Sequence, residues 1–424
     1  MRILIKHGII VTRDKTETNK DILIEDGKIS QIGEGLNEAA DKIIDAAGLA
    51  VLPGLVDAHC HLRDPGYEYK EDIRTGSMSA AKGGFTSIAC MPNTNPVVDN
   101  ESIVRTIMDK ARREGVVNIY PIGAITKGLE GNELSEMGSM KEAGIVAVSD
   151  DGRPVMQASV MKKALIYAGG FGLTVISHCE DLNLAEGGSM NEGETCTKLG
   201  LHGIPSAAED VMVSREIILS EYTGMPVHIA HVSTRGSVAM IREAKKRGVR
   251  VTAETCPHYF TLTEKACEGY NTNAKMNPPL RTREDVDAVI EGLRDGTIDI
   301  IATDHAPHHF DEKNVEFELA PNGIVGFETA LPLALTYLVR PGILTLNQLV
   351  DKMSTRPAEI LKIDKGDIRV GGDADLTLVN LDEEYIIDPD EFLCKSKNTP
   401  FGGFRVFGRV KYTFVGGKIV YNDK

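Results

Sequence analysis

The two ends of the chain show short runs in which apolar residues alternate with polar ones. Residues 1–54 contain three such runs, ILIKHGIIV, DILIEDGKISQIG and KIIDAAGLAVLPG, separated by turn sequences such as EDGK. The C-terminal end shows the same alternation of apolar and polar residues in DADLTLVNL and VFGRVKYTFVGGKIVYN. Alternation with a period of two is typical of strands that bury one face. We therefore expect a small β-sandwich domain built from residues 1–54 and 365–424.

Residues 55–364 follow a different pattern, in which short apolar runs alternate with longer segments of helical periodicity. Helical segments include SIVRTIMDKARREG, SVAMIREAKKRG and REDVDAVIEGLRDG. The apolar runs end near these positions: Asp57, Met91, Ile122, Ser149, His178, His231, Glu254 and Asp304. Strand–helix alternation of this kind predicts an α/β fold, and eight units predict a (β/α)8 TIM barrel. A doubly wound open sheet is the alternative architecture.

Composition and charge narrow the class of protein. The chain has 424 residues, of which 42% are hydrophobic and 26% charged, as in ordinary globular proteins. Its net charge of −15 disfavours nucleic acid and anionic membranes as partners. The seven cysteines lack CxxC spacing, which fits a reducing compartment. The N-terminus resembles a strand more than a signal peptide, and no apolar run has the length of a membrane span. We expect a cytoplasmic protein that acts on a small molecule.

Residues able to bind metals gather at the ends of the apolar runs, where a parallel barrel places its active site. His59 and His61 lie two residues apart in VDAHCHLRDPG, so on a strand both imidazoles point to the same side. A buried histidine pair would explain these two alone. Other runs end in further candidates: Asp151, His178, His231 and Asp304. Together the six residues fit two divalent ions, and their chemistry favours zinc, with manganese or cobalt as substitutes.

Two of these segments resemble fingerprints of the dihydroorotases, a family of cyclic amidohydrolases. HCHLRDPG is similar to the first fingerprint, and ATDHAPHHFDEK, which ends at Lys313, is similar to the second. KMNPPLR also resembles dihydroorotases, whereas related hydantoinases usually carry Ser before the prolines. The resemblance covers essentially the whole chain. It implies reversible zinc-dependent cyclisation of N-carbamoyl-L-aspartate to L-dihydroorotate, the third step of de novo pyrimidine (UMP) synthesis.

The resemblance divides the six candidates between two zinc ions per chain and a bridge. It implies the following ligands: His59, His61 and Asp304 for one ion, His178 and His231 for the other, and Asp151 between them. Many amidohydrolases use a carboxylated lysine as the bridge, whereas AVSDDG offers Asp150 and Asp151 and no lysine. Asp150 is therefore the alternative bridge, and we expect the second zinc site to be only partly occupied.

The chemistry of a cyclic amide then implies a mechanism. Two zinc ions about 3.5–4 Å apart lower the pKa of a bridging water and stabilise the oxyanion, so that a metal-bridging hydroxide is the nucleophile. Asp304 takes a proton from this hydroxide and delivers it to the leaving ring nitrogen. Ring closure runs through the same groups in reverse.

The substrate carries a carboxylate, for which the chain offers a clamp despite its net negative charge. Arg63 follows His61 by two residues and presents a planar fork suited to a carboxylate. An ion pair with Asp64 or Asp72 is the alternative role of Arg63. The expected substrate contacts also include His61, Asn93, Asn277, His308, Asn322 and Gly323. The polar stretch from Pro307 to Gly323 is predicted to be a lid, with an ordinary surface loop as the alternative.

Two other functions stay open at this point. A dihydropyrimidinase, hydantoinase or allantoinase would use the same barrel and metals, but Arg63 and Asn277 favour a substrate with a carboxylate. A non-catalytic homologue that partners aspartate transcarbamoylase would lack metal ligands, and none is missing. The family resemblance also predicts a homodimer, with aspartate transcarbamoylase as a candidate partner. The sequence assigns no role to four residues: Cys256, His258, His305 and His309.

Overall fold

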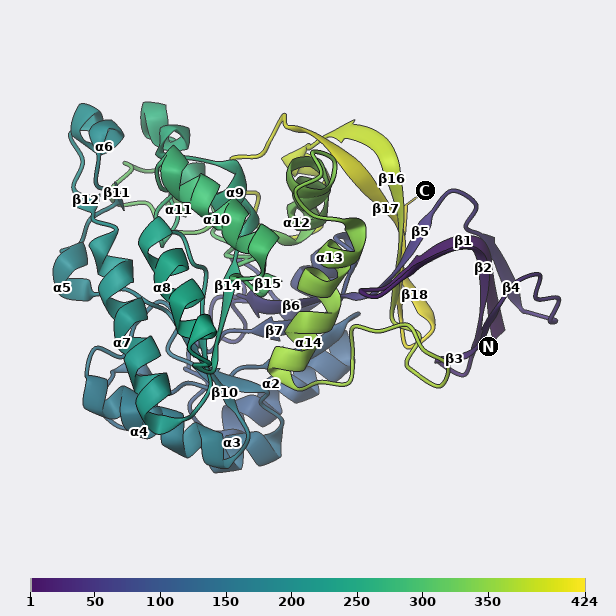
Figure 1. Cartoon of the computed structure of the whole chain (residues 1–424), viewed down its shortest axis with the longest axis horizontal. Coiled ribbons are helices and arrows are strands. Elements are labelled where there is room, and N and C mark those ends of the chain that lie inside the picture. The colour runs from purple at the N-terminus through teal and green to yellow at the C-terminus, as the bar shows by residue number, and fades with distance from the viewer. Residues whose placement is uncertain (1, 424) are drawn as a thin grey trace.

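Strands from both ends of the chain form one sheet in the computed structural model, which describes residues 2–423 (Figure 1). The N-terminal strands are β1 (Arg2–Val11), β2 (Thr16–Glu25), β3 (Lys28–Gly33), β4 (Lys42–Asp45) and β5 (Ala50–Pro53). The C-terminal strands are β16 (Leu376–Ile386), β17 (Arg405–Val415) and β18 (Lys418–Asn422). Their order is β18-β17-β16-β5-β1-β2-β3, with β4 paired to β1. The antiparallel pair of β5 and β16 joins the two ends of the chain.

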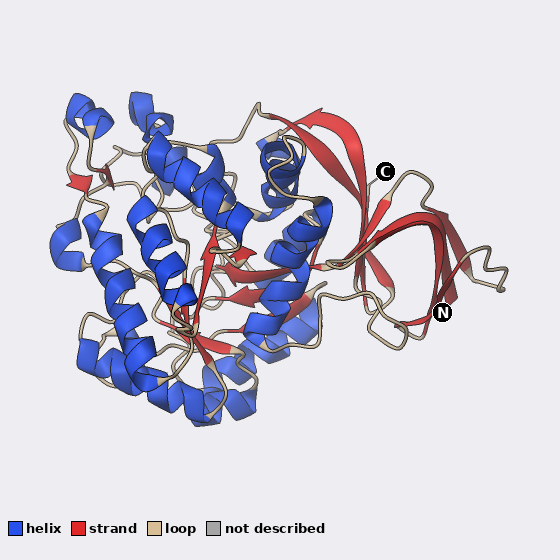
Figure 2. Ribbon diagram, in the orientation of Figure 1, coloured by secondary structure: helices blue, strands red, loops and turns tan. Residues whose placement is uncertain are grey.

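The alternating pattern explains the core of this sheet. The inward residues of β1, β2 and β3 are at most 1% exposed: Ile3, Ile5, Ile22, Ile24 and Ile29. Leu378 of β16 and Phe414 of β17 complete the same apolar cluster. The sheet curls over this core (Figure 2). In place of the predicted sandwich, the structure has one continuous hydrogen-bonded sheet.

The middle of the chain contains parallel strands, as the strand–helix alternation predicts. One sheet has the order β6 (Leu55–Cys60), β7 (Phe85–Cys90), β8 (Asn118–Pro121). A second has the order β15 (Ile300–Ile301), β14 (Val251–Thr255), β13 (Val227–Ile229), β10 (Thr174–Ser177), β9 (Ala147–Ser149). Isolated parallel bridges link the sheets at both sides, one between Gly123 and Val148 and one between Cys60 and His305. The carboxyl ends of these strands therefore meet at one end of the fold.

Helices cover the outside of these strands (Figure 2). The helices of ten or more residues are α1 (Ile73–Lys82), α2 (Glu101–Glu114), α4 (Ala158–Gly170), α7 (Ala207–Thr223), α8 (Arg235–Lys246) and α10 (Arg283–Asp295). Shorter helices are α3 (Met137–Ala143), α5 (Leu182–Ala185), α6 (Glu194–Leu199), α9 (Pro257–Thr261), α11 (Phe310–Lys313), α12 (Phe327–Ala334), α13 (Leu346–Val350) and α14 (Arg356–Leu361). Within residues 2–423, no helix is long and apolar enough to cross a membrane.

The remaining short elements lie in the connections. The 3-10 helices are η1 (Lys127–Leu129), η2 (Glu264–Tyr270), η3 (Thr272–Ala274) and η6 (Pro389–Glu391). The π-helical turns are η4 (Leu335–Val339) and η5 (Asp351–Thr355). Strands β11 (Met190–Asn191) and β12 (Gly203–Ile204) form a separate parallel pair. Long connections of this kind supply residues that can line a binding site at the carboxyl ends of the strands.

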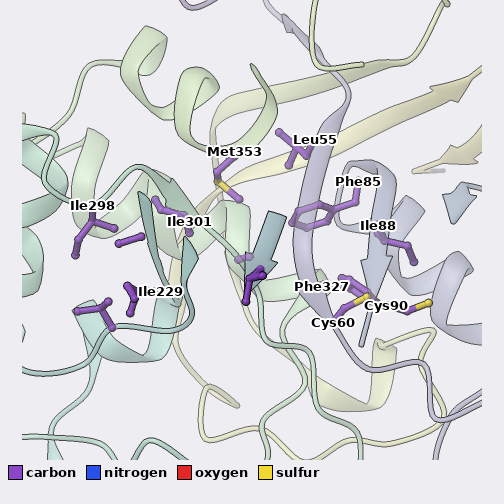
Figure 3. Close-up of a cluster of buried hydrophobic side chains, with 14 of the residues drawn as sticks. Leu55, Cys60, Phe85, Ile88, Cys90, Ile229, Ile298, Ile301, Phe327 and Met353 are labelled. Atoms are coloured by element: carbon purple, nitrogen blue, oxygen red, sulfur yellow. The ribbon is translucent and has the colours of Figure 1, made fainter. Parts of the chain in front are cut away.

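Local sequence signals and apolar packing hold the helices against the strands. Thr282 and Asp285 form a reciprocal capping box at the start of α10, and Asn100 caps α2 through its side chain. Between strands and helices lies the apolar core drawn in Figure 3. There the rings of Phe85 and Phe327 lie 5.8 Å apart, which joins β7 to α12. This core gives the strand ends a rigid base.

Candidate metal centre and substrate clamp

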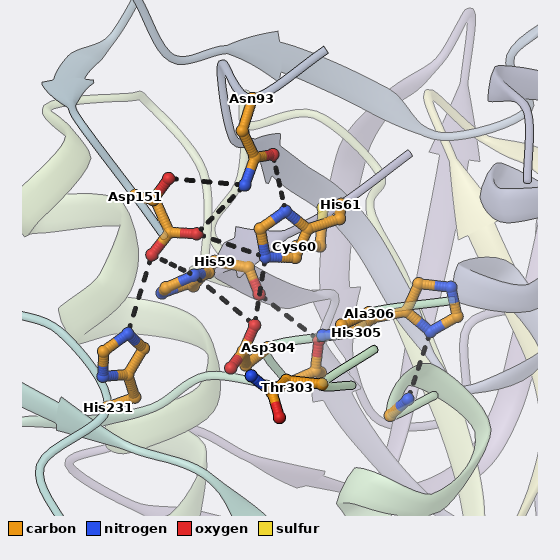
Figure 4. Close-up of polar contacts among 12 residues, drawn as sticks. His59, Cys60, His61, Asn93, Asp151, His231, Thr303, Asp304, His305 and Ala306 are labelled. Atoms are coloured by element: carbon orange, nitrogen blue, oxygen red, sulfur yellow. Dashed lines mark hydrogen bonds and ion pairs between the residues drawn. The ribbon is translucent and has the colours of Figure 1, made fainter. Parts of the chain in front are cut away.

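The six candidate residues at the strand ends meet in one buried cluster, of which Figure 4 labels all but His178. Each is at most 5% exposed: His59, His61, Asp151, His178, His231 and Asp304. The potential ligand atoms of five of them fall into two overlapping groups: His59, His61 and Asp151, and Asp151, His178 and His231. Within each group the atoms lie within 4.8 Å of one another. The cluster can therefore hold two neighbouring cations that share Asp151.

Asp151 lies at the centre of the cluster. Its Oδ1 is 3.4 Å from His59 Nε2, 3.5 Å from His178 Nδ1 and 3.6 Å from His231 Nε2. Its Oδ2 is 3.5 Å from His61 Nε2. Burial disfavours the charged carboxylate, but the surrounding imidazoles outweigh it and hold the pKa of Asp151 well below its ordinary value. Asp151 is thus an anion surrounded by ring nitrogens.

Asp150, the alternative bridge, points away from the histidines. Its Oδ1 accepts hydrogen bonds from the backbone N–H groups of Ile125 and Thr126, at 2.7 and 3.0 Å. Its Oδ2 accepts from the hydroxyl of Thr126. Burial raises the pKa of Asp150 to about 6. Asp150 therefore anchors the connection after β8, whereas Asp151 is free to face the cluster.

Asp304 closes the cluster from the end of β15. Its Oδ1 is 3.1 Å from His61 Nε2 and 3.5 Å from His59 Nε2, and its backbone N–H donates to the carbonyl of His59 at 2.9 Å. Asp304 and His231 both have left-handed backbone, with φ of 45° and 34°. Residues other than glycine rarely adopt this backbone conformation, because it is strained, and strained residues of this kind are typical of functional sites.

Two partners outside the cluster set which ring nitrogen faces it. His59 Nδ1 lies 2.5 Å from Glu254 Oε1, and the other oxygen of Glu254 lies 3.1 Å from His228 Nε2. His61 Nδ1 lies 2.9 Å from Asn93 Oδ1. A carboxylate or amide oxygen that accepts from one ring nitrogen leaves the other free to bind a metal. Glu254 ends an apolar run in the sequence, and that position is the signal that could have identified it.

The cluster has the electrostatics of a cation site. Nε2 of His59, which faces Asp151 and Asp304, is buried without a hydrogen-bond partner among the described residues. Although burial disfavours a charged ring, the neighbouring carboxylates raise the pKa of His59 well above its ordinary value and that of His178 to about 10. Buried carboxylates thus demand positive charge, which divalent ions on these donors would supply. The residues present therefore fit metal ions.

A further group of donors lies beside Asp304. Cys256, His258 and Asp304 also bring ligand atoms within 4.8 Å of one another. Burial lowers the pKa of His258 to about 4, so this ring is neutral. His305 instead stacks on Phe327, with ring centres 4.0 Å apart, and accepts a hydrogen bond from a backbone N–H. It belongs to the wall behind the cluster (Figure 4).

A cavity of about 250 Å³ opens from the cluster. Besides five of the six cluster residues, its lining includes Arg63, Asn93, Asn277, His308 and Asn322. Arg63 donates from Nε to the carbonyl of Pro307 at 3.1 Å, and its Nη2 lies 3.2 Å from His308 Nε2. It makes no ion pair with Asp64 or Asp72, which bind Lys110 and Lys395 instead. The guanidinium is therefore directed into the cavity.

The other expected substrate contacts are held by neighbours. Asn93 Nδ2 lies 3.4 Å from Asp151 Oδ2, so Asn93 touches both Asp151 and His61. Asn277 Nδ2 donates to Glu180 Oε2 at 3.0 Å, and the same oxygen is 3.4 Å from His178 Nε2. No pattern in the sequence identifies Glu180 as part of this network. Both amides therefore connect the cavity to the metal-binding residues.

The stretch from Pro307 to Gly323 forms one wall of the cavity and contains α11. Lys275 Nζ donates to the carbonyls of Phe317 and Glu318, both at 2.8 Å. Lys313 Nζ donates to the carbonyls of Pro321 and Gly323, at 2.8 and 3.2 Å. Two buried lysines thus hold the segment that is predicted to be a lid.

Gly323 lies behind Asn322 in this wall. Its N–H donates to the carbonyl of Lys275 at 2.9 Å, and its carbonyl accepts from Asn398 Nδ2 at 2.9 Å. Asn398 also donates to the carbonyl of Ala306 and accepts from the N–H of His308, both at 3.0 Å. The backbone of Gly323 is therefore occupied by structural bonds, and Asn322 is the member of the pair that lines the cavity.

Comparison with known proteins identifies the family of this chain. A family model described as "Dihydro-orotase-like" matches residues 48–237. Proteins named Dihydroorotase from Acetivibrio thermocellus and Ruminiclostridium cellulolyticum are 64% and 60% identical over 100% of this chain and 99% of theirs. The chain belongs to the dihydroorotase family. This confirms the family and the enzymatic class that the two fingerprints and KMNPPLR predict.

Solved structures of related enzymes share the fold of this dihydroorotase family member. An L-hydantoinase (dihydropyrimidinase) from Arthrobacter aurescens has a TM-score of 0.90 at 28% identity and covers 99% of this chain and 96% of its own. A dihydropyrimidinase from Brevibacillus agri has a TM-score of 0.87 at 27% identity, with coverage of 100% and 95%. The sequence identity to the dihydroorotases is about twice as high, so the hydantoinases share chiefly the architecture.

Proposed function

We propose that this dihydroorotase family member catalyses the reversible cyclisation of N-carbamoyl-L-aspartate to L-dihydroorotate, in pyrimidine synthesis, at a centre of two zinc ions. One observation carries the proposal. Two groups of buried ligands share Asp151 and open into the same cavity as the guanidinium of Arg63. A metal pair beside a cationic carboxylate site suits a cyclic amide that carries a carboxylate.

We also propose a closed (β/α)8 barrel over residues 55–364, flanked by residues 1–54 and 365–424 as the two parts of the β domain. The parallel bridges that link the two central sheets at both sides support the closed barrel. The pairing of β5 with β16 supports the domain limits, because both strands belong to the terminal sheet.

The donors divide naturally between two ions. In this proposal His59, His61 and Asp304 would hold one ion and His178 and His231 the other, with Asp151 shared as the two ligand groups suggest. The 3.1 Å distance between His61 Nε2 and Asp304 Oδ1 supports placing Asp304 with the first ion. Bound zinc would supply Lewis acidity, which activates water and stabilises negative charge on the amide oxygen. The protein contributes orientation, since Glu254 and Asn93 hold the outer nitrogens of His59 and His61.

Asp304 is the proposed general acid and base. Burial opposes its ionisation, but His59 and His61 outweigh this effect and lower the pKa of Asp304. The carboxylate is thus ionised near neutral pH and lines the cavity. In ring opening it would accept a proton from the attacking water and return it to the leaving ring nitrogen, and in ring closure the transfers reverse.

The clamp orients the substrate. Arg63 and His308 present donors to its carboxylate, and Asn93 adds an amide donor. Asn277 would exchange its bond to Glu180 for one to the ring amide, and the backbone at Asn322, supported by Gly323, would face the same amide. The homodimer, the association with aspartate transcarbamoylase and the cytoplasmic location stay predictions.

A comparison of substrates tests this function. Purified, zinc-loaded protein is assayed for cyclisation of N-carbamoyl-L-aspartate and for ring opening of L-dihydroorotate, 5,6-dihydrouracil and hydantoin. We expect turnover of the two substrates with a carboxylate and little of the neutral rings. Faster turnover of hydantoin or dihydrouracil than of dihydroorotate would replace this proposal with a hydantoinase-type activity.

A further inference from the structure

A lysine outside all the expected site residues lies directly behind the carboxylate clamp. Lys70, in the connection between β6 and α1, places its Nζ 3.4 Å from His308 Nδ1 and 3.0 Å from Glu312 Oε1. Its side chain is only 14% exposed. Its backbone carbonyl accepts a hydrogen bond from Ser396 Oγ at 2.7 Å. Lys70 is thus fixed in place on the side of the His308 ring that faces away from Asn322.

The contacts of His308 determine which of its nitrogens carries the proton. Nε2 lies 2.8 Å from the carbonyl oxygen of Asn322, and because a carbonyl only accepts, Nε2 must donate. Burial, together with the charges of Arg63, Lys70 and Lys313, holds the pKa of His308 well below its ordinary value, so the ring is neutral. Nδ1 therefore bears a lone pair. The ammonium of Lys70, which can only donate, is the matching partner.

A competing acceptor makes this arrangement depend on Lys70. Glu312 Oε2 lies 3.5 Å from His308 Nδ1 and would favour a proton on that nitrogen. Lys70 engages the other oxygen of Glu312, and Tyr69 donates its hydroxyl to that same oxygen at 2.8 Å. Without the ammonium, Nδ1–H would donate to the carboxylate of Glu312, and Nε2 would give up its bond to the Asn322 carbonyl and accept from Arg63 Nη2 instead.

The proton on Nε2 matters because Arg63 faces the same atom. Arg63 Nη2 lies 3.2 Å from His308 Nε2, and in this tautomer both atoms are donors. Two donors at this distance do not bond to each other, but they can share an anionic oxygen placed between them, for which Nε2–H would exchange its bond to the Asn322 carbonyl. In the opposite tautomer Nε2 would accept from Arg63, and one arm of the clamp would be lost to an internal bond.

We propose that Lys70 is a positioning residue that holds His308 as the Nε2–H tautomer and thereby makes the cavity selective for a ring that carries a carboxylate. This inference deepens the proposed function and rests on it. Lys70 does not line the cavity, so it acts through His308 and through its charge, without touching the substrate.

The experiment combines kinetics with NMR on the zinc-loaded enzyme. Lys70→Met keeps the length of the stem and removes the ammonium, and Lys70→Arg restores a cation that can only donate. Lys82→Met is the matched control, because Lys82 is similarly shielded and also pairs with a glutamate, Glu328, at 2.9 Å, but lies outside the cavity. Long-range 1H–15N correlations identify the protonated nitrogen of His308, assigned by loss of its signals in His308→Gln.

We expect Lys70→Met to raise KM for L-dihydroorotate about 10-fold, the loss of one charge-assisted contact, with kcat changed less than about 2-fold. The proton of His308 should move to Nδ1. Lys70→Arg should recover most of the KM and the Nε2–H signal, and Lys82→Met should match wild type in both. If Lys70→Met does not fold, Lys70→Gln provides the same readouts.

An unchanged KM, or an unchanged tautomer, in folded Lys70→Met would overturn the inference, since it requires both to change together. Failure of the proposed function looks different. In that case wild-type protein itself would not turn over dihydroorotate, while the NMR comparison of Lys70→Met with wild type would still report whether Lys70 sets the tautomer.

Discussion

The metal-binding cluster and the substrate clamp lie in the same cavity but are built in opposite ways. In the cluster, carboxylate oxygens and ring nitrogens lie 3.1 to 3.6 Å apart, and His59 Nε2, which faces the carboxylates, has no hydrogen-bond partner among the described residues. In the wall behind the clamp, Asn398 and two lysines make hydrogen bonds of 2.8 to 3.2 Å to backbone carbonyls. The cluster needs cations for completion, whereas the protein itself completes the clamp.

This difference separates two tasks of the enzyme. The chemical step needs charge that side chains alone do not supply, and metals provide it. Recognition of a carboxylate needs donors at fixed positions, and buried hydrogen bonds provide that rigidity. Changes in the cluster should therefore reduce kcat, whereas changes behind the clamp should chiefly raise KM.

The largest effect is expected for Asp304→Asn. The amide keeps the size and one oxygen of the carboxylate but cannot accept a proton, so we predict a loss of kcat of at least about 10²-fold, the usual yield of general acid–base catalysis, with much of the zinc retained. Steady-state kinetics and elemental analysis of the same sample measure both. Asp285→Asn is the control, because Asp285 is buried in the cap of α10. Near-normal turnover by the Asp304→Asn variant would remove Asp304 from the proton transfer.

Arg63→Lys should have the next largest effect. Lysine keeps the charge but loses the planar fork that binds a carboxylate through two hydrogen bonds, so we predict a loss of about 100-fold in kcat/KM for dihydroorotate. Arg215→Lys serves as control, since Arg215 donates to two backbone carbonyls away from the cavity. A wild-type kcat/KM for Arg63→Lys, equal to that of the Arg215→Lys control, would mean that Arg63 is not part of the clamp.

Asn398→Ala tests whether the wall of the clamp is preassembled. The change leaves the N–H of His308 and the carbonyls of Ala306 and Gly323 without their buried partner. We expect KM to rise about 10-fold and the free energy of unfolding to fall by about 2 kcal/mol. Urea unfolding and initial-rate kinetics measure the two effects. Asn347→Ala, which removes hydrogen bonds to Thr12 and Thr16, should leave KM unchanged.

An effect on stability alone concerns its dependence on pH. Burial, reinforced by the nearby charge of Lys275, lowers the pKa of Lys313 from 10.5 to about 7. Between these values the unfolded chain binds one more proton than the folded chain, so this group makes the protein more stable as pH rises, by at most about 1.4 kcal/mol per pH unit. Below about pH 7 both states are protonated and the contribution is constant.

Urea unfolding at about pH 6.5 and at about pH 9.5 measures how the contribution of Lys313 to the free energy of unfolding changes with pH. Most of the expected change lies between these two pH values. The stability of wild type relative to Lys313→Met should increase with pH, because all other groups are common to both proteins. Lys163→Met, which changes an exposed lysine on α4, should show no such trend. A constant difference between wild type and Lys313→Met would mean that Lys313 stays charged in the wall.

The same contrast explains what the sequence could predict. The metal-binding residues lie at the ends of apolar runs, and parallel strands bring such ends together, so His59, Asp151 and Asp304 can be found from pattern alone. Lys70 and Asn398 lie in connections far apart in the chain, where no periodicity relates them to His308. Their contacts depend on how loops pack, which a single sequence does not encode in a readable period.

Metal content measured together with turnover tests the central claim, that these buried histidines and aspartates form a two-zinc centre for opening and closing a cyclic amide. Protein purified without chelator is divided, stripped with dipicolinate and titrated with zinc, while elemental analysis and dihydroorotate turnover are recorded at each step. We predict loss of activity on stripping and its recovery as zinc approaches about two ions per chain, with the second ion the more weakly held. Full turnover by protein that contains no divalent metal would contradict the account.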